Sequence, residues 1–289
     1  MLPAMASKPH IAIVGPGRLG SALALELSRA GYRIAEIVAR KQEGKARLLA
    51  RKMRARGSVP ENAVLNADLI WFCVPDREIA VAARALASKV SWRGKTAFHS
   101  SGALASKELD ALRKRGAQVA AVHPLMTFVR GAVPPLKGVP FSIEGDRGAV
   151  RVAQAIVRNL GGKTFPIRAG HKAAYHTWGA FTSPLLVALL MSSEQVARVA
   201  GLKPAQARKR MLPILRQTIE NYRRLGPAGA MSGPLVRGDA EIVRKHLNVL
   251  EKIPKARDAY LVLARTAVQH LPVQQRRKLE NALRKKANR

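Results

Sequence analysis

The sequence predicts an α/β protein in two parts: a doubly wound parallel sheet over residues 1–167 and an all-helical domain over residues 168–289. Short strand-like runs alternate with helical segments in the first part, which is the pattern of a parallel sheet with helices on both faces. A glycine-rich turn joins the first strand to the first helix. After Arg168, long helical stretches replace the strand-like runs. With 289 residues, 47% of them hydrophobic, the chain can bury a sizeable core.

The most informative segment is the first strand–helix–strand unit. Ile11 to Val14 form an apolar run of the kind found in strands buried on both faces. A helix-forming stretch follows the glycine turn, from about Leu19 to Ala30, and Gly31 ends it. Residues 32–38 then have the pattern of a second strand. This order predicts a βαβ unit.

Further elements follow in alternation. Strands are predicted at 67–74, 95–99, 118–122 and 139–143, and helices at 79–87, 103–115 and 148–160. In the second part, helices are predicted at 171–200, 204–225, 240–250 and 256–270, with a basic final helix from residue 273. Ser183-Pro184 has the pattern of a helix cap followed by Pro at the first helical position, so a break is predicted there.

The turn GPGRLG places Gly15, Gly17 and Gly20 in the G-x-G-x-x-G spacing, directly after a strand and before a helix. Gly15 would permit the tight turn, Gly17 would let the backbone approach a pyrophosphate, and Gly20 would allow the helix to pack closely on the strand. The helix N-terminus offers free N–H groups to the phosphates. A plain structural glycine turn is the alternative. The candidate cofactor-binding residues in and around this turn are Gly15, Pro16, Gly17, Arg18, Leu19, Gly20, Arg40, Lys41, Val74, Pro75 and Ser100.

The end of the second strand favours NADP over NAD as the cofactor. NAD sites usually carry an acidic residue about 20 positions after the glycines, which binds the ribose 2′-hydroxyl. This chain has Arg40 and Lys41 there and no carboxylate before Glu43. An arginine at this point suits a 2′-phosphate. The alternative is that so basic a chain carries Arg and Lys there by composition alone, since residues 40–56 hold eight basic side chains.

Candidate catalytic residues lie after strands and at the start of the helical part. His123 ends a predicted strand, where ligands of open parallel sheets bind, and histidine can donate a proton near neutral pH. Lys172 and His176 are four residues apart, so they share one helix face. We expect His123, Lys172 and His176 to converge on one interdomain pocket that also receives Ser100 or Ser101. A histidine that caps a strand, and a solvated polar face on the helix, are the alternatives.

Two further residues are candidates for contact with substrate. Ser101 belongs to the Ser-Ser-Gly turn after the predicted strand 95–99. Arg237 lies in the constrained loop GPLVRGD and could hold a carboxylate in a bidentate pair. An ion pair of Arg237 with Asp239 is the alternative. No metal site is predicted.

The combination of GPGRLG, FHSSGAL, VHPLMTF, KAAYHTWGAF and GPLVRGDAEIV resembles a bacterial group of Rossmann-like proteins whose C-terminal domain is of unknown function. The layout is also similar to the superfamily of 6-phosphogluconate, 3-hydroxyisobutyrate and prephenate dehydrogenases, pyrroline-5-carboxylate reductases and ketopantoate reductases. The resemblance implies that His123 contacts the reacting hydroxyl, as in prephenate dehydrogenases. It also implies that Lys172 matches a catalytic lysine of hydroxyisobutyrate-type enzymes, although His176 stands where they have asparagine. A homodimer through the helical domains is implied as well.

Charge and cysteine content limit the other function classes. The formal net charge is +33, and the excess is spread along the chain, with +16 over residues 1–165 and +17 over the rest. We find no nucleic-acid-binding motif, so we expect sequence-independent attraction to polyanions and no specific nucleic-acid partner. Cys73 is the only cysteine, which excludes an intramolecular disulfide and fits a reducing, cytoplasmic location. We expect no secretory signal and no membrane segment, because the longest apolar stretch is interrupted at residues 182–184.

Together these features predict an NADP-dependent dehydrogenase or reductase. It would transfer a hydride between NADPH and a small carbonyl or imine substrate, such as a 2-keto acid, a ketopantoate-like compound or a cyclic imine. A non-catalytic NADP-binding sensor or scaffold protein is the first alternative, since it would keep the glycine turn without needing a proton donor. A basic protein associated with nucleic acid is the second.

Overall fold

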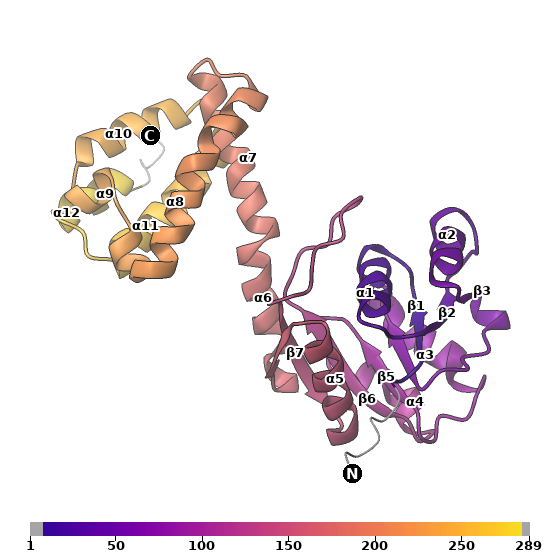
Figure 1. The fold of residues 1–289 in the computed structure, drawn as a ribbon. Coiled ribbons are helices and arrows are strands. Elements are labelled where there is room, and N and C mark those ends of the chain that lie inside the picture. The colour runs from indigo at the N-terminus through magenta and orange to yellow at the C-terminus, as the bar shows by residue number, and fades with distance from the viewer. Residues whose placement is uncertain (1–7, 285–289) are drawn as a thin grey trace, which may run out of the picture. The chain divides into compact units, whose positions relative to one another are not determined.

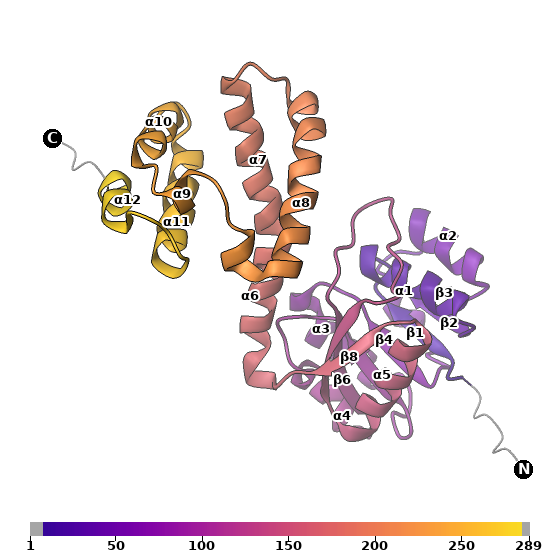
Figure 2. The ribbon, with the colours of Figure 1, turned by 60° about the vertical axis from the view of Figure 1, so that its left-hand side comes forward.

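The computed structural model describes residues 8–284 and divides into two compact units, Met1–Phe181 and Thr182–Arg289 (Figures 1 and 2). The predicted boundary after residue 167 coincides with the end of the last strand, at Pro166. The first unit continues beyond that point through helix α6, Lys172–Thr182, almost to the end of the helix. Buried side chains of α6, Lys172 and Tyr175, contact residues of the sheet and its loops.

An eight-stranded sheet forms the centre of the first unit, in the order β3-β2-β1-β4-β5-β6-β7-β8. The strands are β1 Ile11–Val14, β2 Ile34–Val38, β3 Arg56–Ser58, β4 Leu69–Phe72, β5 Thr96–His99, β6 Gln118–Pro124, β7 Pro140–Gly145 and β8 Lys163–Pro166. Every pair of neighbouring strands is parallel except β6 and β7. The predicted fold class, a Rossmann-like and mostly parallel sheet followed by a helical region, is confirmed.

Strand β7 is the exception to the all-parallel sheet that the alternation predicts. It runs antiparallel to β6, with His123 paired to Ser142 and Pro124 to Phe141. The segment 125–139 between the two strands contains no helix. Because a parallel pair needs a crossover connection, usually helical, the chain here turns back beside β6 instead.

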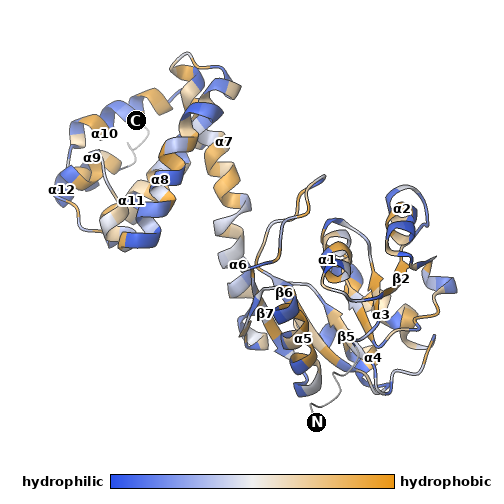
Figure 3. Cartoon of the chain, in the orientation of Figure 1, coloured by the Kyte–Doolittle hydropathy of each residue, from blue (hydrophilic) through white to orange (hydrophobic). Residues whose placement is uncertain are grey.

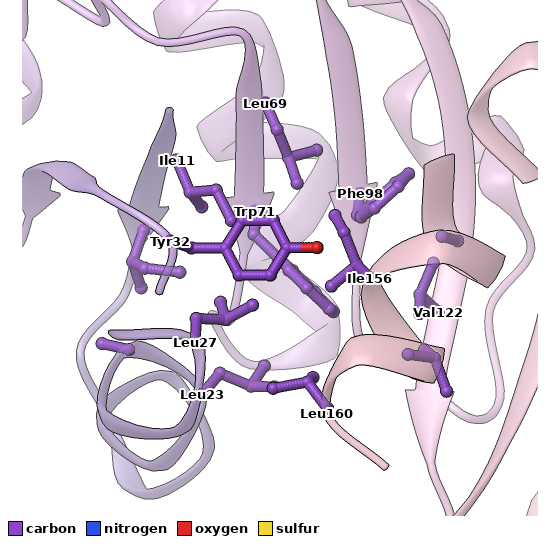
Figure 4. Close-up of a cluster of buried hydrophobic side chains, with 14 of the residues drawn as sticks. Ile11, Leu23, Leu27, Tyr32, Leu69, Trp71, Phe98, Val122, Ile156 and Leu160 are labelled. Carbon is purple, nitrogen blue, oxygen red and sulfur yellow. The ribbon is translucent and has the colours of Figure 1, made fainter. Parts of the chain in front are cut away.

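Helices cover both faces of the sheet (Figure 1), which explains why the central strands β1 and β4 are apolar and buried at every position. They are α1 Arg18–Arg29, α2 Gly44–Met53, α3 Asp76–Ala87, the short α4 Asp110–Arg113 and α5 Arg147–Asn159, with 3₁₀ turns η1 Pro60–Asn62, η2 Ser106–Leu109 and η3 Ala169–His171. In β1, Ile11 and Ile13 belong to one core cluster, and Ala12 and Val14 belong to another. The first cluster packs with α1 and α5 around Trp71 (Figure 4).

Sequence patterns missed or misplaced some elements of the first unit. Helix α2 and strands β3 and β8 lie where no element was predicted. The helix predicted at 103–115 begins only at Ser106, as η2, and continues as the single turn α4. Its expected first residues are instead held in a side-chain turn, because Ser101 Oγ accepts hydrogen bonds from the N–H groups of Ala103 and Leu104.

The second unit is helical throughout its described part, and no strand lies between Pro166 and residue 284. Its helices are α7 Pro184–Val199, α8 Pro204–Ala230, α9 Pro234–Arg237, α10 Ala240–Leu250, α11 Pro254–His270 and α12 Arg276–Leu283. The predicted break at Ser183-Pro184 is present between α6 and α7. Helix α8 is longer than predicted, and Gly226, with φ +67°, kinks it before its last turn. A core cluster joins α10, α11 and α12 within this unit.

One helical stretch in the described part of the chain, Ala169–Val199, is long and apolar enough to cross a membrane. The sequence predicts no such segment, because residues 182–184 interrupt its longest apolar stretch, yet the helical region continues past them. The apolar window of this stretch is not buried in the structure, and Figure 3 shows many hydrophobic residues on α7. A helix covered by another protein chain meets the same criteria of length and composition.

Candidate active site

The turn between β1 and α1 can be built only with glycine at two positions. Gly15 has φ +91°, and a Cβ there would lie 2.7 Å from Val74 Cγ1. At Gly20 a Cβ would lie 2.2 Å from the carbonyl oxygen of Gly15. Both approaches are far inside van der Waals contact. The tight turn and the close packing of helix on strand that the motif predicts are therefore present.

Gly17 differs from the other two glycines because a side chain at this position would meet no protein atom. A Cβ at Gly17 would have no neighbour within 4 Å, and its φ of −71° suits any residue. It is the N-cap of α1, whose first turn has neither an acidic residue nor a side-chain cap. The N–H groups of this turn are thus available to an anion at the positive end of the helix.

A cleft of about 550 Å³ opens at this turn and continues past the ends of β2 and β4. Of the residues predicted to bind cofactor, it is lined by Gly15, Pro16, Gly17, Arg40, Val74 and Pro75. Lys41 is exposed outside the lining, as is Arg18. Leu19 packs against the core, and Gly20 allows the helix to pack closely on the strand. Ser100 is buried, and its Oγ accepts a 2.8 Å hydrogen bond from Trp71 Nε1.

The loop after β5 is fixed by a buried histidine. His99 Nδ1 accepts a hydrogen bond from the N–H of Ser101 at 3.1 Å, so its Nε2 carries the proton and donates to the carbonyl of Ala105 at 2.9 Å. Burial lowers the pKa of His99 to about 4, which keeps the ring neutral at pH 7. With both ring nitrogens used in this way, His99 sets the path of the loop that carries Ser101.

Lys172 is buried completely against this loop. Its Nζ donates a 3.0 Å hydrogen bond to the carbonyl oxygen of Ser101, 71 residues earlier in the chain. Burial lowers the pKa of Lys172 to about 8, although the charges of Glu144 and Asp76 oppose this change. A lysine with this pKa exchanges its proton readily near neutral pH, as an acid–base group must.

His123 forms a pair with Tyr175 of α6. The Nδ1 atom of His123 lies 2.8 Å from the Tyr175 hydroxyl. Burial lowers the pKa of His123 to about 4, with smaller contributions from the charges of Lys172, His176 and His99, so the ring is neutral at pH 7. Burial also raises the pKa of Tyr175, which keeps its hydroxyl protonated. When that hydroxyl donates to Nδ1, the imidazole proton resides on Nε2.

The side chains of His123 and His176 meet beside Gly102. A Cβ on Gly102 would lie 2.9 Å from His123 Nε2 and 2.8 Å from Cδ2 of His176. The two imidazole rings are 6.3 Å apart, centre to centre, and nearly perpendicular. His176 is exposed, whereas His123 is half-buried and Lys172 is buried. The structure thus brings the three predicted catalytic side chains together around residues 101 and 102, within the first unit. Their catalytic role stays a prediction.

Sequence reasoning did not select three residues of this cluster. Tyr175 is three positions after Lys172, so a search for polar groups on the face shared with Lys172 could have found it. The sequence predicts His99 only as the last residue of the strand 95–99, and its hydrogen bonds to the following loop depend on contacts that no local pattern encodes. Gly102 has no positive φ, and only its closeness to two histidines requires a glycine.

The two predicted substrate residues have local partners in the structure. The Ser101 hydroxyl accepts hydrogen bonds from two N–H groups of its own loop, and the Ser101 carbonyl accepts one from Lys172. Arg237 belongs to the second unit and forms a 2.9 Å ion pair with Asp239, which was the alternative considered for it. Neither contact tests their role toward a substrate, which stays a prediction.

Comparisons with known proteins agree with this architecture. Residues 4–124 match the Rossmann-like domain, and residues 139–267 match a domain of unknown function, DUF2520. No curated protein matches the chain. These matches confirm the predicted resemblance to Rossmann-like proteins with a C-terminal domain of unknown function.

Three solved structures show how widely the fold is shared. BF3122 from Bacteroides fragilis is 22% identical with a TM-score of 0.75, over 90% of this chain and 97% of that one. A reductive aminase from Aspergillus terreus, in complex with NADPH and ethyl-5-oxohexanoate, is 15% identical with a TM-score of 0.67, over 95% and 99%. A pyrroline-5-carboxylate reductase from Coxiella burnetii is 14% identical with a TM-score of 0.58, over 90% and 98%. At these identities the similarity shows the fold alone.

Proposed function

Because this chain joins a Rossmann-like domain to a DUF2520 domain, we propose that it is an NADP-dependent oxidoreductase that reduces a small carbonyl or imine compound. The fold is that of enzymes that include an NADPH-bound reductive aminase, at low identity. The cleft at Gly15 and Gly17 fits a dinucleotide, since one glycine makes the turn and the other leaves open space beside free helix N–H groups.

One observation supports catalysis over binding alone. The cofactor cleft lies at the ends of β1, β2 and β4, and the cluster of Lys172, His123 and Tyr175 gathers at the ends of the adjacent strands β5 and β6. Both therefore belong to the carboxyl edge of the same sheet, where ligands of this fold class bind. A sensor would need the cleft but would gain nothing from a buried lysine and a hydrogen-bonded Tyr–His pair.

The side chains have separate roles in the proposed reaction. The nicotinamide, when bound, supplies the hydride, and the protein must supply a proton to the oxygen or nitrogen of the substrate. Lys172 stabilises the negative charge that develops on that atom and can release a proton near pH 8. His123, neutral and held by Tyr175, offers its Nε2–H as a hydrogen-bond donor. A 2-keto acid, a ketopantoate-like compound or a cyclic imine would present such an atom.

We also propose that the protein works as a homodimer through its helical part. Helix α7 exposes several large apolar side chains, Leu185, Leu186, Val187, Leu189 and Met191, and α8 exposes Leu212, Ile214, Ile219, Tyr222 and Leu225. An unpartnered apolar surface of this extent is typical of an interaction site. The mass in solution, measured by light scattering, tests this proposal. A monomer that floats with lipid vesicles would support membrane binding instead.

The proposed reaction can be tested at Lys172. We expect wild-type protein to oxidise NADPH with at least one member of a panel of 2-keto acids and cyclic imines. Lys172→Met keeps the length and apolar stem of the side chain but removes its charge. We expect this change to lower kcat by ~100-fold or more and to leave the Kd for NADPH, measured by calorimetry, nearly unchanged.

Exposed Lys163 on β8 provides the matched control, since Lys163→Met should leave kcat and the Kd unchanged. Thermal unfolding of all three proteins shows whether the fold is intact. Wild-type protein that binds NADPH but reduces no member of the panel would favour the sensor, and an active Lys172→Met variant would remove Lys172 from the mechanism.

A further inference from the structure

Two arginines from different elements share a single carboxylate at the rim of the cofactor cleft. Arg40 follows β2, whereas Arg77 and Glu78 belong to the first turn of α3. Arg40 Nη2 lies 3.0 Å from Oε1 of Glu78, and Arg77 Nε lies 3.5 Å from the same oxygen. All three residues line the cleft that begins at the glycine turn. Of these three residues, the sequence indicated only Arg40 as a contact for the cofactor.

The three side chains differ in how freely they can move. Those of Arg40 and Arg77 are 76% and 85% exposed, whereas that of Glu78 is 28% exposed. The guanidinium groups therefore have room to turn from the carboxylate toward a bound anion. Exposed ion pairs of this kind contribute little to stability, so an arginine loses little when it exchanges one anion for another.

We propose that Arg77 is a second ligand for the 2′-phosphate of NADP, and that the Glu78 carboxylate occupies the place of this phosphate until the cofactor binds. This inference rests on the proposed function and adds to it a specificity-determining arginine and a competing carboxylate. Both arginines turn from Glu78 to the phosphate when the cofactor enters.

The chemistry of the two cofactors explains why this arrangement selects between them. A phosphate monoester carries up to two negative charges and three acceptor oxygens, so it can accept hydrogen bonds from two guanidinium groups at once. It can therefore displace a single carboxylate from both arginines. The 2′-hydroxyl of NAD is neutral and cannot compete with Glu78. The ion pairs then persist, and NAD gains nothing from either arginine.

A second carboxylate lines the same cleft and serves as an internal comparison. Glu61 follows Pro60 in η1 and is exposed. Among the described residues it forms no ion pair with Arg40 or Arg77. A variant at Glu61 therefore changes the charge of the cleft without freeing either arginine. Arg84, exposed on α3 and outside the lining, is the equivalent comparison for Arg77.

The test uses two probes of the adenosine end, so that it does not depend on turnover. Adenosine 2′,5′-bisphosphate carries the 2′-phosphate, and adenosine 5′-monophosphate lacks it. Their dissociation constants are measured by calorimetry for the full-length wild-type protein and for each variant. We expect wild-type protein to bind the bisphosphate at least ~10-fold more tightly, because each charge-assisted contact contributes this order of affinity.

The variants change the ratio of the two dissociation constants, bisphosphate against monophosphate, in opposite directions. Arg77→Ala should weaken binding of the bisphosphate by about tenfold and leave the monophosphate unchanged. Glu78→Gln should strengthen binding of the bisphosphate by about threefold or more, because the arginines no longer need to leave a carboxylate. Glu61→Gln and Arg84→Ala should leave the ratio of the two constants near its wild-type value.

The outcomes separate this inference from the function on which it rests. Wild-type protein that binds neither probe nor NADPH would overturn the proposed function itself. If wild-type protein prefers the bisphosphate but Arg77→Ala leaves that preference intact, the role of Arg77 is wrong and NADP binding stands. Weaker binding of the bisphosphate by Glu78→Gln would overturn the competing role of Glu78, as would an equal gain in Glu61→Gln.

Discussion

Gly102 lies where the side chains of His123 and His176 meet, and it has no space for a methyl group. A Cβ would lie under 3.0 Å from each ring. Gly102→Ala should therefore displace one or both imidazoles and lower kcat by ~10- to 100-fold, since small misplacements of reacting groups have effects of this size. Shifts of the histidine ring signals by NMR provide a readout independent of any substrate.

Gly170 provides the matched control for Gly102. It lies in η3, just before α6, and a Cβ there would have no neighbour within 4 Å. Gly170→Ala should leave kcat and the ring signals unchanged. Unchanged ring signals in Gly102→Ala would contradict the packing of both histidines on this glycine.

Two histidines of the first unit, His99 and His123, predict how stability depends on pH. The pKa values of His99 and His123 are about 4 in the folded protein and near 6.5 when the side chains are exposed. Between these values the unfolded chain binds more protons than the folded one. The free energy of unfolding should therefore fall as pH decreases from about 6.5 to 4, by up to roughly 3 kcal/mol for one such group.

Urea denaturation at several pH values measures this dependence. His123→Gln should flatten it relative to wild type, because one of the two groups no longer titrates. His270, exposed on α11, is the control, and His270→Gln should leave the dependence unchanged. A His123→Gln profile parallel to that of wild type would show that folding does not lower the pKa of His123.

At the scale of elements, the β1–α1 turn contains one glycine that packing requires, Gly20, and one whose Cβ would meet no protein atom, Gly17. Gly20→Ala places a Cβ 2.2 Å from the Gly15 carbonyl oxygen, so helix and strand must move apart. We expect it to lower the free energy of unfolding by about 1–3 kcal/mol, as overpacking does. Gly17→Ala meets no protein atom, so it should leave stability near the wild-type value and weaken NADPH binding by ~10-fold or more.

Calorimetry with NADPH and urea denaturation of both variants test this pair. A destabilised Gly17→Ala variant with unchanged NADPH binding would show that the motif is structural only.

Local patterns predicted α1, β1 and α10 well, because each has a clear period and a clear end. They missed α2, whose buried face is only Ala46, Leu49 and Ala50 among many basic residues.

At the scale of the whole molecule, the net charge of +33 predicts attraction to polyanions without recognition of sequence. Two DNA duplexes of unrelated sequence should bind with equal affinity. Their affinity should fall by ~10-fold or more between 50 and 200 mM salt, as counterion release requires. Fluorescence anisotropy measures both effects. A sequence-selective complex at physiological salt would instead support a specific nucleic-acid function.

The sequence by itself determined the class of the fold and the position of the glycine turn between β1 and α1. Both depend on short-range features: apolar runs of strand length, helical periodicity, and three glycines at fixed spacing. A residue such as Gly15 is required by its own backbone conformation, so its role can be predicted without knowledge of the remainder of the chain. The break at Ser183-Pro184 is equally local.

Only the tertiary structure decided which side chains meet. Lys172 reaches the carbonyl of Ser101 across 71 residues, and Tyr175 reaches His123 across 52. Such contacts depend on the order of the strands and on the face of α6 that becomes buried, neither of which a local pattern encodes. Burial also sets the pKa values of His123 and Lys172, because it is the loss of water around a charge that changes them.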